Sequence, residues 1–410
     1  LLLAAAGAGC GAGATGPDPG APLDAPPRAL SAAEQRAVAA GNAFSIDLFR
    51  EVSRRRADSN VVISPLSASI ALGMTANGAA GETRAGMLRA LRTDARDLAE
   101  LNQAYRDLAQ YLLGIDRSVQ LGIANAIFYR NGFPFTDAFL QTTRQWFDAE
   151  VRGLDFADEA GTLRAVNGWA SAKTNGRIER VLTQVHPRDV MYLMNAVYFK
   201  ARWVARFDPA QTRPAPFAVR GGAPANVPTM TRAETRMRGA FVGSAQAGVA
   251  QVGELAYGNS AYVMTIVLPP RGTSVERFVA ELTPTRWDSL VGALRDAEQM
   301  VALPRFTLRY EDTWNDVLTT MGMGLAFQEG RADFTGMSPR GRDLFLAFVK
   351  QNVFIQVDEE GTEAAAVTTV GVRVESAPPS FTVDRPFVLA IRERFSGAIL
   401  FIGKVVDPRG

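Results

Sequence analysis

The segment from Thr362 to Glu375 alternates between two kinds of side chain, and this alternation constrains the fold more than any other feature. Successive residues of a β-strand point to opposite faces of the sheet. One face of this segment would hold only small or β-branched side chains, and the other would hold every charge. The members of the first face are Thr362, Ala364, Ala366, Thr368, Val370, Val372 and Val374. The pattern predicts a half-buried strand.

A second strand pattern, 345–357, precedes this segment, and only the acidic turn 358–361 separates the two. Gly361 gives the backbone a hinge, and the pair Pro378-Pro379 ends any strand. A strand as long as the segment from Thr362 to Glu375 would be unusual in a settled sheet. The residues alone leave two interpretations open: a long edge strand after an acidic turn, or a segment that does not belong to a static fold.

Helical patterns dominate the first part of the chain and strand patterns the second. Ser31 and Glu34 have the spacing of a capping box, which starts a helix that runs towards Ser53. A second helix is predicted over about 94–113 from its apolar stripe. Strands are predicted at 121–129, 191–199, 261–268, 345–357, 386–392 and 398–406. Without strict βαβ alternation or an internal linker, this order predicts one α+β domain over residues 31–410.

The chain has one histidine, His186, and one cysteine, Cys10, which excludes most catalytic chemistry. Neither a multi-histidine nor a four-cysteine zinc site can be built. A Ser/His/Asp triad would need His186, which we expect to be a loop or strand-end residue. We therefore expect a protein that is not an enzyme and that has no cofactor and no metal.

Charge gives little reason to expect a polyanionic partner. The formal net charge is +2, which provides no general argument for nucleic acid or an anionic membrane. The one basic run, 54–56, follows a predicted helix, where such residues complement the helix dipole and face water. We expect no nucleic-acid partner, and the sequence offers no basic helix face on which to propose a polyanion activator.

Residues 1–30 have the composition of an export signal remnant followed by a flexible tether. Their apolar start is too short to span a bilayer. Cys10 follows small residues of the kind found before bacterial lipoprotein cleavage sites, although Gly7 stands where a large aliphatic residue is usual. Cys10 is therefore either a lipid attachment site that tethers the protein to a membrane or a free cysteine. Both interpretations predict an extracytoplasmic protein, which is secreted, periplasmic or lipid-anchored, and the arginine-rich composition suggests a bacterial source.

Several motifs resemble, in order, those of the serpin family of serine-protease inhibitors. The run from Glu359 to Ala366 looks like the proximal hinge of the serpin reactive-centre loop. Further similar motifs are Asn60–Ser67, Asn167–Trp169, Thr174–Ile178, Asn195–Lys200, Asp333–Met337 and Asp384–Phe387. The resemblance covers about residues 34 to 408. It implies one domain with the serpin fold, in which several helices pack on three β-sheets and a reactive-centre loop is exposed at 359–379.

The resemblance also implies a mechanism, suicide-substrate trapping of a protease. The protease cleaves the exposed loop and becomes acylated, and the freed loop then inserts as a new strand into the largest sheet. Inserting residues need small inward side chains and no proline. The hinge residues are Glu359, Gly361, Thr362, Glu363, Ala364, Ala365 and Ala366. They favour an inhibitor, and the alternative is a non-inhibitory serpin that acts as a binding or chaperone module.

Counting from Gly361 along the usual loop length places the reactive bond at Glu375-Ser376. Glu375 would be the primary specificity residue, which suggests a Glu-specific or elastase-like serine protease as the partner. Cleavage after Val374 would favour elastase-type enzymes, and cleavage after Arg373 would favour trypsin-type ones. The resemblance further implies a monomer.

Two supporting clusters carry over from the family. At the breach, where the loop first enters the sheet, Glu359 would pair with Arg305 above Trp203. The shutter, a polar cluster beneath the opening strands, would consist of Ser64, Ser67, Asn195 and Gln351. The family commonly has histidine at the position of Gln351. Glutamine still donates and accepts hydrogen bonds, so we expect the sheet to open but not in a pH-sensitive way.

Overall fold

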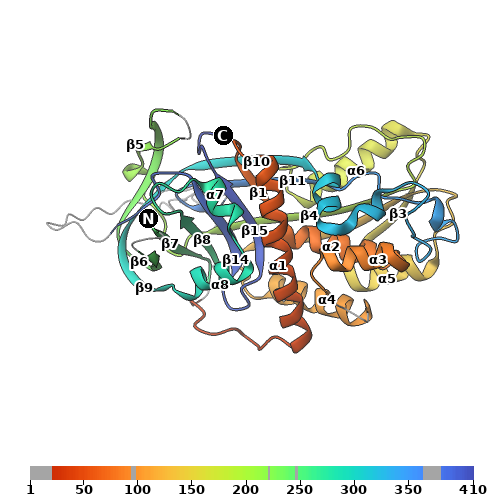
Figure 1. Cartoon of the computed structure of the whole chain (residues 1–410), viewed down its shortest axis with the longest axis horizontal. Helices are drawn as coiled ribbons and strands as arrows, with labels where there is room; N and C mark the ends of the chain where they lie inside the picture. The colour runs from red at the N-terminus through yellow and green to blue at the C-terminus, as the bar shows by residue number, and fades with distance from the viewer. Residues whose placement is uncertain (1–20, 94–97, 220–221, 245–247, 363–379) are drawn as a thin grey trace, which may run out of the picture.

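The structure is a computed structural model, and it describes residues 21–93, 98–219, 222–244, 248–362 and 380–410. Within these ranges the chain forms two β-sheets with helices packed on their faces (Figure 1). The predicted α+β class is confirmed, but the described residues form two sheets where the resemblance implies three. No helix of the described ranges is long and apolar enough to cross a membrane.

A six-stranded sheet has the strand order β10, β11, β12, β4, β2, β3. Its strands are β10 Phe306–Thr313, β11 Lys350–Val357, β12 Gly361–Thr362, β4 Met191–Arg202, β2 Gln120–Arg130 and β3 Glu150–Leu154. The short strand β12 is antiparallel to both of its neighbours, β11 and β4. Within the described residues, β12 is also the only hydrogen-bonded link between them, so the sheet is divided below it.

The second sheet has nine strands in the described residues, in the order β1, β15, β14, β8, β7, β6, β9, β13, with β5 paired to β6. They are β1 Val61–Ile63, β15 Ile399–Val405, β14 Phe387–Glu393, β8 Tyr262–Leu268, β7 Gly248–Tyr257, β6 Ala225–Ser244, β9 Arg295–Pro304, β13 Ser380–Thr382 and β5 Arg213–Phe217. The register of β6 shifts between Arg232 and Thr235, yet the strand continues for 20 residues. Because β6 is continuous, it joins strands that would otherwise form two separate sheets.

The helices begin with α1, Ala32–Arg55, whose capping box is formed as predicted. The others are α2 Pro65–Ala76, α3 Gly81–Ala90, α4 Leu98–Gly114, α5 Asp137–Phe147, α6 Glu159–Lys173, α7 Val275–Ala280, α8 Pro284–Gly292 and α9 Asn315–Leu318. Shorter helical turns are η1 Pro209–Gln211, η2 Thr319–Met323, η3 Gly324–Phe327 and η4 Gly341–Asp343. Helix α2 begins only at Pro65, after strand β1, so most of the 60–67 motif is not helical.

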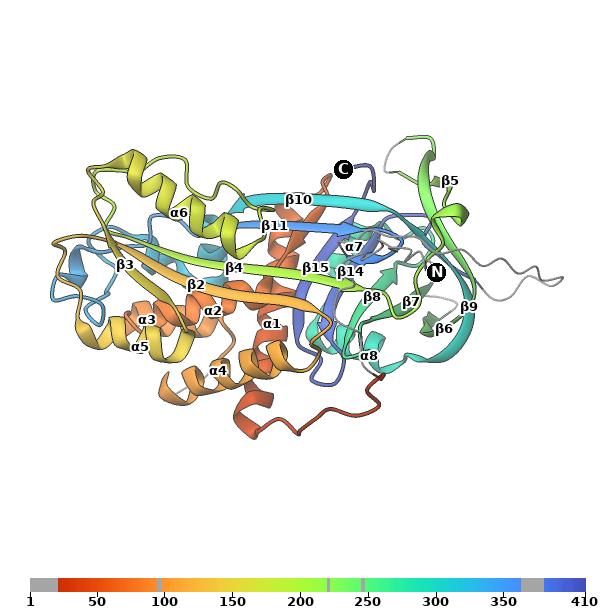
Figure 2. The same ribbon diagram turned by 180° about the vertical axis from the view of Figure 1, so that it is seen from behind.

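Two hydrophobic clusters divide the interior. The larger one contains α1, α2 and most strands of the nine-stranded sheet. The smaller one packs α6 against β2, β3 and β4 through residues that include Trp169, Phe128 and Tyr192. Figure 2 shows α6 on the opposite face of the six-stranded sheet from α2. Helix α6 therefore forms one packed unit with the strands on the β4 side of the division.

The strand predicted at 345–357 begins only at Lys350, which corrects the sequence-based boundary. The residues before it bond to the α9 region instead of a neighbouring strand. The Val349 amide donates to Asn315 Oδ1 at 2.9 Å, and the Trp314 amide donates to the Val349 carbonyl at 2.8 Å. Because these groups are already satisfied, the ladder with β10 cannot extend further.

Residues 21–30, which the sequence predicts to be part of a flexible tether, contact the domain. The Leu23 amide donates to the Asn259 carbonyl at 2.8 Å. Arg28 Nη1 donates to Glu34 Oε2 at 2.8 Å, and the Arg28 guanidinium lies 5.1 Å from the centre of the Tyr111 ring. This part of the N-terminal segment therefore lies against α1, α4 and the turn before β8. Cys10 lies outside the described residues.

Candidate functional site

A tight acidic turn places β12 between β11 and β4. The Asp358 amide donates to the Gly361 carbonyl at 2.9 Å, and Asp358 Oδ1 accepts from the amides of Glu360 and Gly361 at 3.1 and 3.3 Å. A Cβ atom on Gly361, whose φ is +153°, would lie 2.1 Å from the Ala201 carbonyl oxygen. Only glycine permits this approach of two backbones. The close approach of β12 to β4 therefore requires glycine at position 361.

Thr362, the last described residue before the loop, is buried with its side chain towards the interior. Its exposed fraction is 2%, and its Oγ1 lies 2.7 Å from the Tyr257 hydroxyl. The Tyr257 ring in turn stacks on Trp203, with ring centres 4.3 Å apart. The inward face predicted from the alternation is therefore correct at Thr362, the one member of that face that the structure describes.

The residues predicted for the breach lie together around the acidic turn. Arg305 Nη1 lies 3.6 Å from Glu359 Oε1, which also accepts a 2.7 Å hydrogen bond from Thr212 Oγ1. Trp203 Nε1 donates to the Asp358 carbonyl at 2.9 Å. Thr212 was not predicted, because it comes from a segment with no motif and only the fold brings it to Glu359.

Acidic groups crowd this turn. Glu360 forms an ion pair of 3.0 Å with Arg206, which the sequence analysis also missed. Burial raises the pKa of the Asp358 carboxyl above its usual 3.8, and the nearby carboxylates of Glu359 and Glu360 add to this rise. The folded turn therefore disfavours the charged form of Asp358.

The four predicted shutter residues form two separate pairs, one on each side of the divided sheet. On the β11 side, Gln351 Oε1 accepts from the Ser64 amide and Gln351 Nε2 donates to the Ser64 carbonyl, both at 2.8 Å. On the β4 side, Ser67 Oγ donates to Asn195 Oδ1. Asn195 Nδ2 then donates to Asn125 Oδ1 at 2.6 Å. Asn125 was missed because its strand pattern contains no signal for a polar partner.

A cavity of about 630 Å³ lies between β4 and β11 below β12, and we call it the slot. The polar pairs of the shutter lie along it, since Asn195 and Gln351 both line it. Its floor is helix α2, its walls are residues 191–196 and 344–352, and its roof is the linker between α6 and β4. The floor residues are Ser67, Ala68, Ala71, Leu72 and Thr75. This lining suits an extended segment with small apolar side chains.

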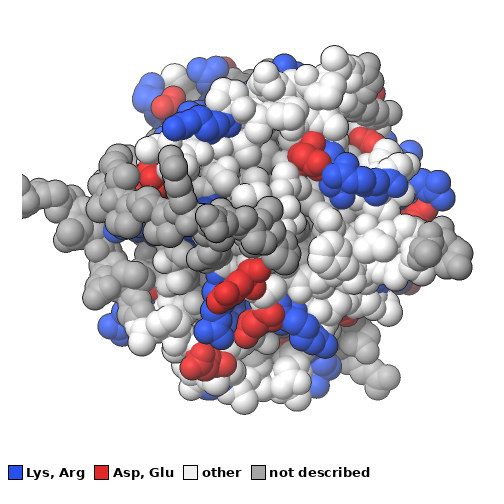
Figure 3. Space-filling view, turned by 90° about the vertical axis from the view of Figure 1, so that its left-hand side faces the viewer, with Lys and Arg blue, Asp and Glu red and all other residues white. Residues whose placement is uncertain are grey.

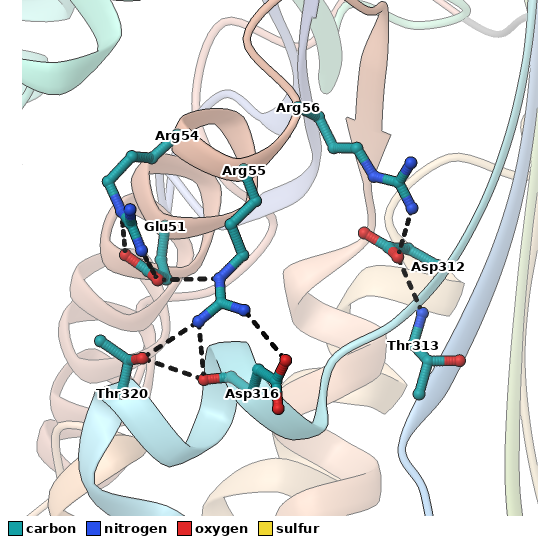
Figure 4. A network of polar contacts seen from close by, with 8 residues as sticks. All are labelled: Glu51, Arg54, Arg55, Arg56, Asp312, Thr313, Asp316 and Thr320. Atoms are coloured by element: carbon teal, nitrogen blue, oxygen red, sulfur yellow. Dashed lines mark hydrogen bonds and ion pairs between the residues drawn. The ribbon is translucent and has the colours of Figure 1, made fainter.

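The basic run at the end of α1 is paired with carboxylates (Figure 4). Arg54 and Arg55 both bond to Glu51, at 2.7 and 3.0 Å. Arg56 pairs with Asp312 at 2.9 Å. On the molecular end drawn in Figure 3, basic and acidic side chains also lie interspersed. These arginines contribute to local ion pairs rather than to one continuous cationic surface.

His186 lies in an exposed loop before β4, as predicted, where Gln184 Nε2 lies 2.7 Å from its Nε2. Within the described ranges, no three His, Cys, Asp or Glu side chains gather in a way that could hold a metal ion. The remaining predicted site residues are Glu363, Ala364, Ala365, Ala366, Glu375 and Ser376, and they lie outside the described residues.

A short strand, β12, held between the two halves of a divided sheet is the arrangement of a known class of proteins, which includes inhibitors that take a segment of their own loop into a sheet. The chain matches the family described as serpin (serine protease inhibitor) over residues 39–408, and it belongs to that family. The family is described as one of serine protease inhibitors and not of enzymes, so the protein is not an enzyme. The family resemblance noted in the sequence is thereby confirmed.

Relatives match nearly the whole chain. Serpin A3-5 of Bos taurus is 31% identical over 370 residues, which cover 89% of this chain and 87% of the relative. Neuroserpin of Gallus gallus is 31% identical over 374 residues, covering 89% and 90%. The native structure of tengpin, a thermophilic serpin, has a TM-score of 0.80 at 30% identity and covers 94% of this chain and 96% of tengpin.

Proposed function

We propose that this serpin inhibits a serine protease by suicide-substrate trapping. The protease would cleave Glu375-Ser376, and residues 361–375 would insert as a strand between β4 and β11. The observation that carries the proposal is the position of β12, which already pairs antiparallel with both strands at the head of the slot. The first residues of the inserting strand are thus seated before any cleavage.

The register of β12 supports the direction of insertion. Gly361 and Thr362 pair with Arg202 and Ala201 on β4, and Thr362 pairs with Val357 on β11. Continued down the slot, the same register would bring Thr368 opposite both Asn195 and Gln351. Thr368 is the only polar member of the inward face after Thr362, and it would lie at the level of the polar shutter residues Asn195 and Gln351.

Side-chain size also supports insertion. The inward residues between Thr362 and Thr368 are Ala364 and Ala366. By the same register, Ala364 would stand opposite Phe199 and Ile355, and Ala366 opposite Val197 and Val353, where a methyl group needs little room. A large or charged residue at position 362 would have to be buried beside Tyr257, and burial of an unpaired charge costs several kcal/mol. Thr362→Arg should therefore stop insertion at its first step.

The test is incubation of the protein with elastase-like, Glu-specific and trypsin-like serine proteases, followed by denaturing electrophoresis. We expect a covalent complex with at least one protease from the wild-type protein and only cleaved product from Thr362→Arg. If wild-type protein is cut by every active protease and never forms the complex, the non-inhibitory alternative is correct. Sequencing of the released fragment identifies the bond and separates Glu375 from Val374 and Arg373.

We further propose an extracytoplasmic location, based on the composition of residues 1–30. Lipid attachment at Cys10 would tether the inhibitor to a membrane surface and leave the slot and loop free to meet a protease. Mass spectrometry of protein from membrane and soluble fractions of its source, which composition suggests is bacterial, would detect the lipid on Cys10. A free thiol in both fractions would contradict this part of the proposal.

A further inference from the structure

We propose that Arg177 sets how fast a strand can enter the slot, because its side chain fastens the roof of the slot to β11. This inference rests on the proposed strand insertion and names a residue that regulates it. The roof is the linker that follows α6, residues 174–182, and its members Thr174, Ile178, Val181 and Leu182 line the slot.

Hydrogen bonds hold this roof to α6. Asn167 Oδ1 accepts from the amides of Val181 and Leu182 at 2.8 and 2.9 Å, and Asn167 Nδ2 donates to the Leu182 carbonyl at 2.8 Å. Thr174 Oγ1 donates to the Ala170 carbonyl at 2.8 Å and accepts from the Ile178 amide at 3.0 Å. The roof therefore moves with α6, which packs on the β4 side of the slot.

Arg177 reaches from the roof to the other side of the slot. Its guanidinium lies 5.3 Å from the centre of the Phe354 ring, which belongs to β11. The ring carries a second guanidinium, that of Arg309 on β10, at 4.7 Å. Arg309 and Phe354 are also direct partners in the ladder between β10 and β11. Of the two cation–π contacts, only that of Arg177 crosses the slot.

An entering strand must disturb this contact. Side chains of a strand alternate, so half of those entering would point outward, towards the roof. Ile178, Val181 and Leu182 line the space that these side chains require, and the roof has to lift to admit them. Lifting it with α6 withdraws Arg177 from Phe354. An exposed cation–π contact is strong enough to change such a rate about two- to fivefold.

The experiment compares wild-type protein with Arg177→Ala, Arg177→Lys and Phe354→Leu, and it uses Arg309→Ala as the matched control. Arg309 contacts the same ring but stays on the β11 side, so its loss should not free the roof. The loop is cut by a large excess of protease, so that cleavage is not limiting. Samples taken with time are then heated, and the fraction that has become resistant to unfolding gives the rate of strand entry.

In Arg177→Ala and Phe354→Leu, we expect the rate of strand entry to be about two to five times that of wild type. In Arg177→Lys and Arg309→Ala, we expect it to be close to that of wild type. A merely structural role of Arg177 would change the stability of the uncleaved protein but would not produce this order of rates. Equal or slower entry in Arg177→Ala, or an equal gain in Arg309→Ala, overturns the inference. If even wild-type protein never gains resistance, the proposed strand insertion fails instead.

Discussion

Two single residues, Gly361 and Asp358, hold the start of the loop between its neighbouring strands. Gly361 is required because any Cβ atom would collide with the Ala201 carbonyl. Asp358 closes the turn through two backbone amides, yet its own carboxyl is buried beside the carboxylates of Glu359 and Glu360. The turn thus gains two hydrogen bonds at the cost of an unfavourable charge.

The two hydrogen bonds and the buried charge of Asp358 together predict the effect of Asp358→Asn. Asparagine keeps the Oδ1 acceptor and removes the charge, so the uncleaved protein should become more stable at pH 7 by about 0.5–1.5 kcal/mol. The pKa of Asp358 is raised in the folded protein, so the wild-type protein recovers this deficit as the pH falls through the raised pKa. The stability gained by Asp358→Asn over wild type should therefore become smaller as the pH falls.

Urea unfolding of wild type and Asp358→Asn at pH 7 and near pH 4 measures this difference. Asp288→Asn serves as the control, because Asp288 is exposed on α8 and lies far from the turn in the sequence. A gain from Asp358→Asn that is equal at both pH values would show that charge burial at Asp358 is not the cause.

At the scale of elements, the proposed insertion depends on how well the inserting strand matches β4 and β11, the two strands that flank the slot. The polar pairs Ser67–Asn195 and Ser64–Gln351 lie on opposite walls. The register of β12 directs one hydroxyl, that of Thr368, to the level of both pairs. The shutter residues would thus offer polar partners to the inserted strand, as they offer them to one another before insertion.

Thr368→Val tests this register. Valine keeps the shape and removes the hydroxyl, so loop-cleaved protein should lose about 1 kcal/mol of stability while uncleaved protein is unchanged. Thr369→Val, one residue further along on the outward face, should change neither form by more than about 0.5 kcal/mol. Guanidinium unfolding of both forms of both variants gives the comparison. A larger loss in Thr369→Val would mean that the register is shifted by one residue.

At the scale of the whole molecule, the proposed inhibition draws its energy from completing the divided sheet. Two strands separated by a cavity of about 630 Å³ would both gain a hydrogen-bonded neighbour. Each net hydrogen bond contributes about 1 kcal/mol, and the inward side chains add apolar burial.

Cleavage of the loop should therefore raise the unfolding temperature of the molecule markedly, without loss of the cut fragment. Differential scanning calorimetry before and after limited proteolysis measures this shift, and Thr362→Arg should show none of it. An unchanged unfolding temperature in cleaved wild-type protein would leave trapping without a driving force.

The sequence by itself determined the local features of this protein. Capping at Ser31 and Glu34, the strand patterns, the hinge glycine and the family motifs are all encoded by neighbouring residues, which is why they could be predicted. The contacts of the site join distant segments. Thr212 and Arg206 at the turn, Asn125 in the shutter and Phe354 under Arg177 carry no local signal. Only the tertiary structure decided them, because packing selects those partners after the chain has folded.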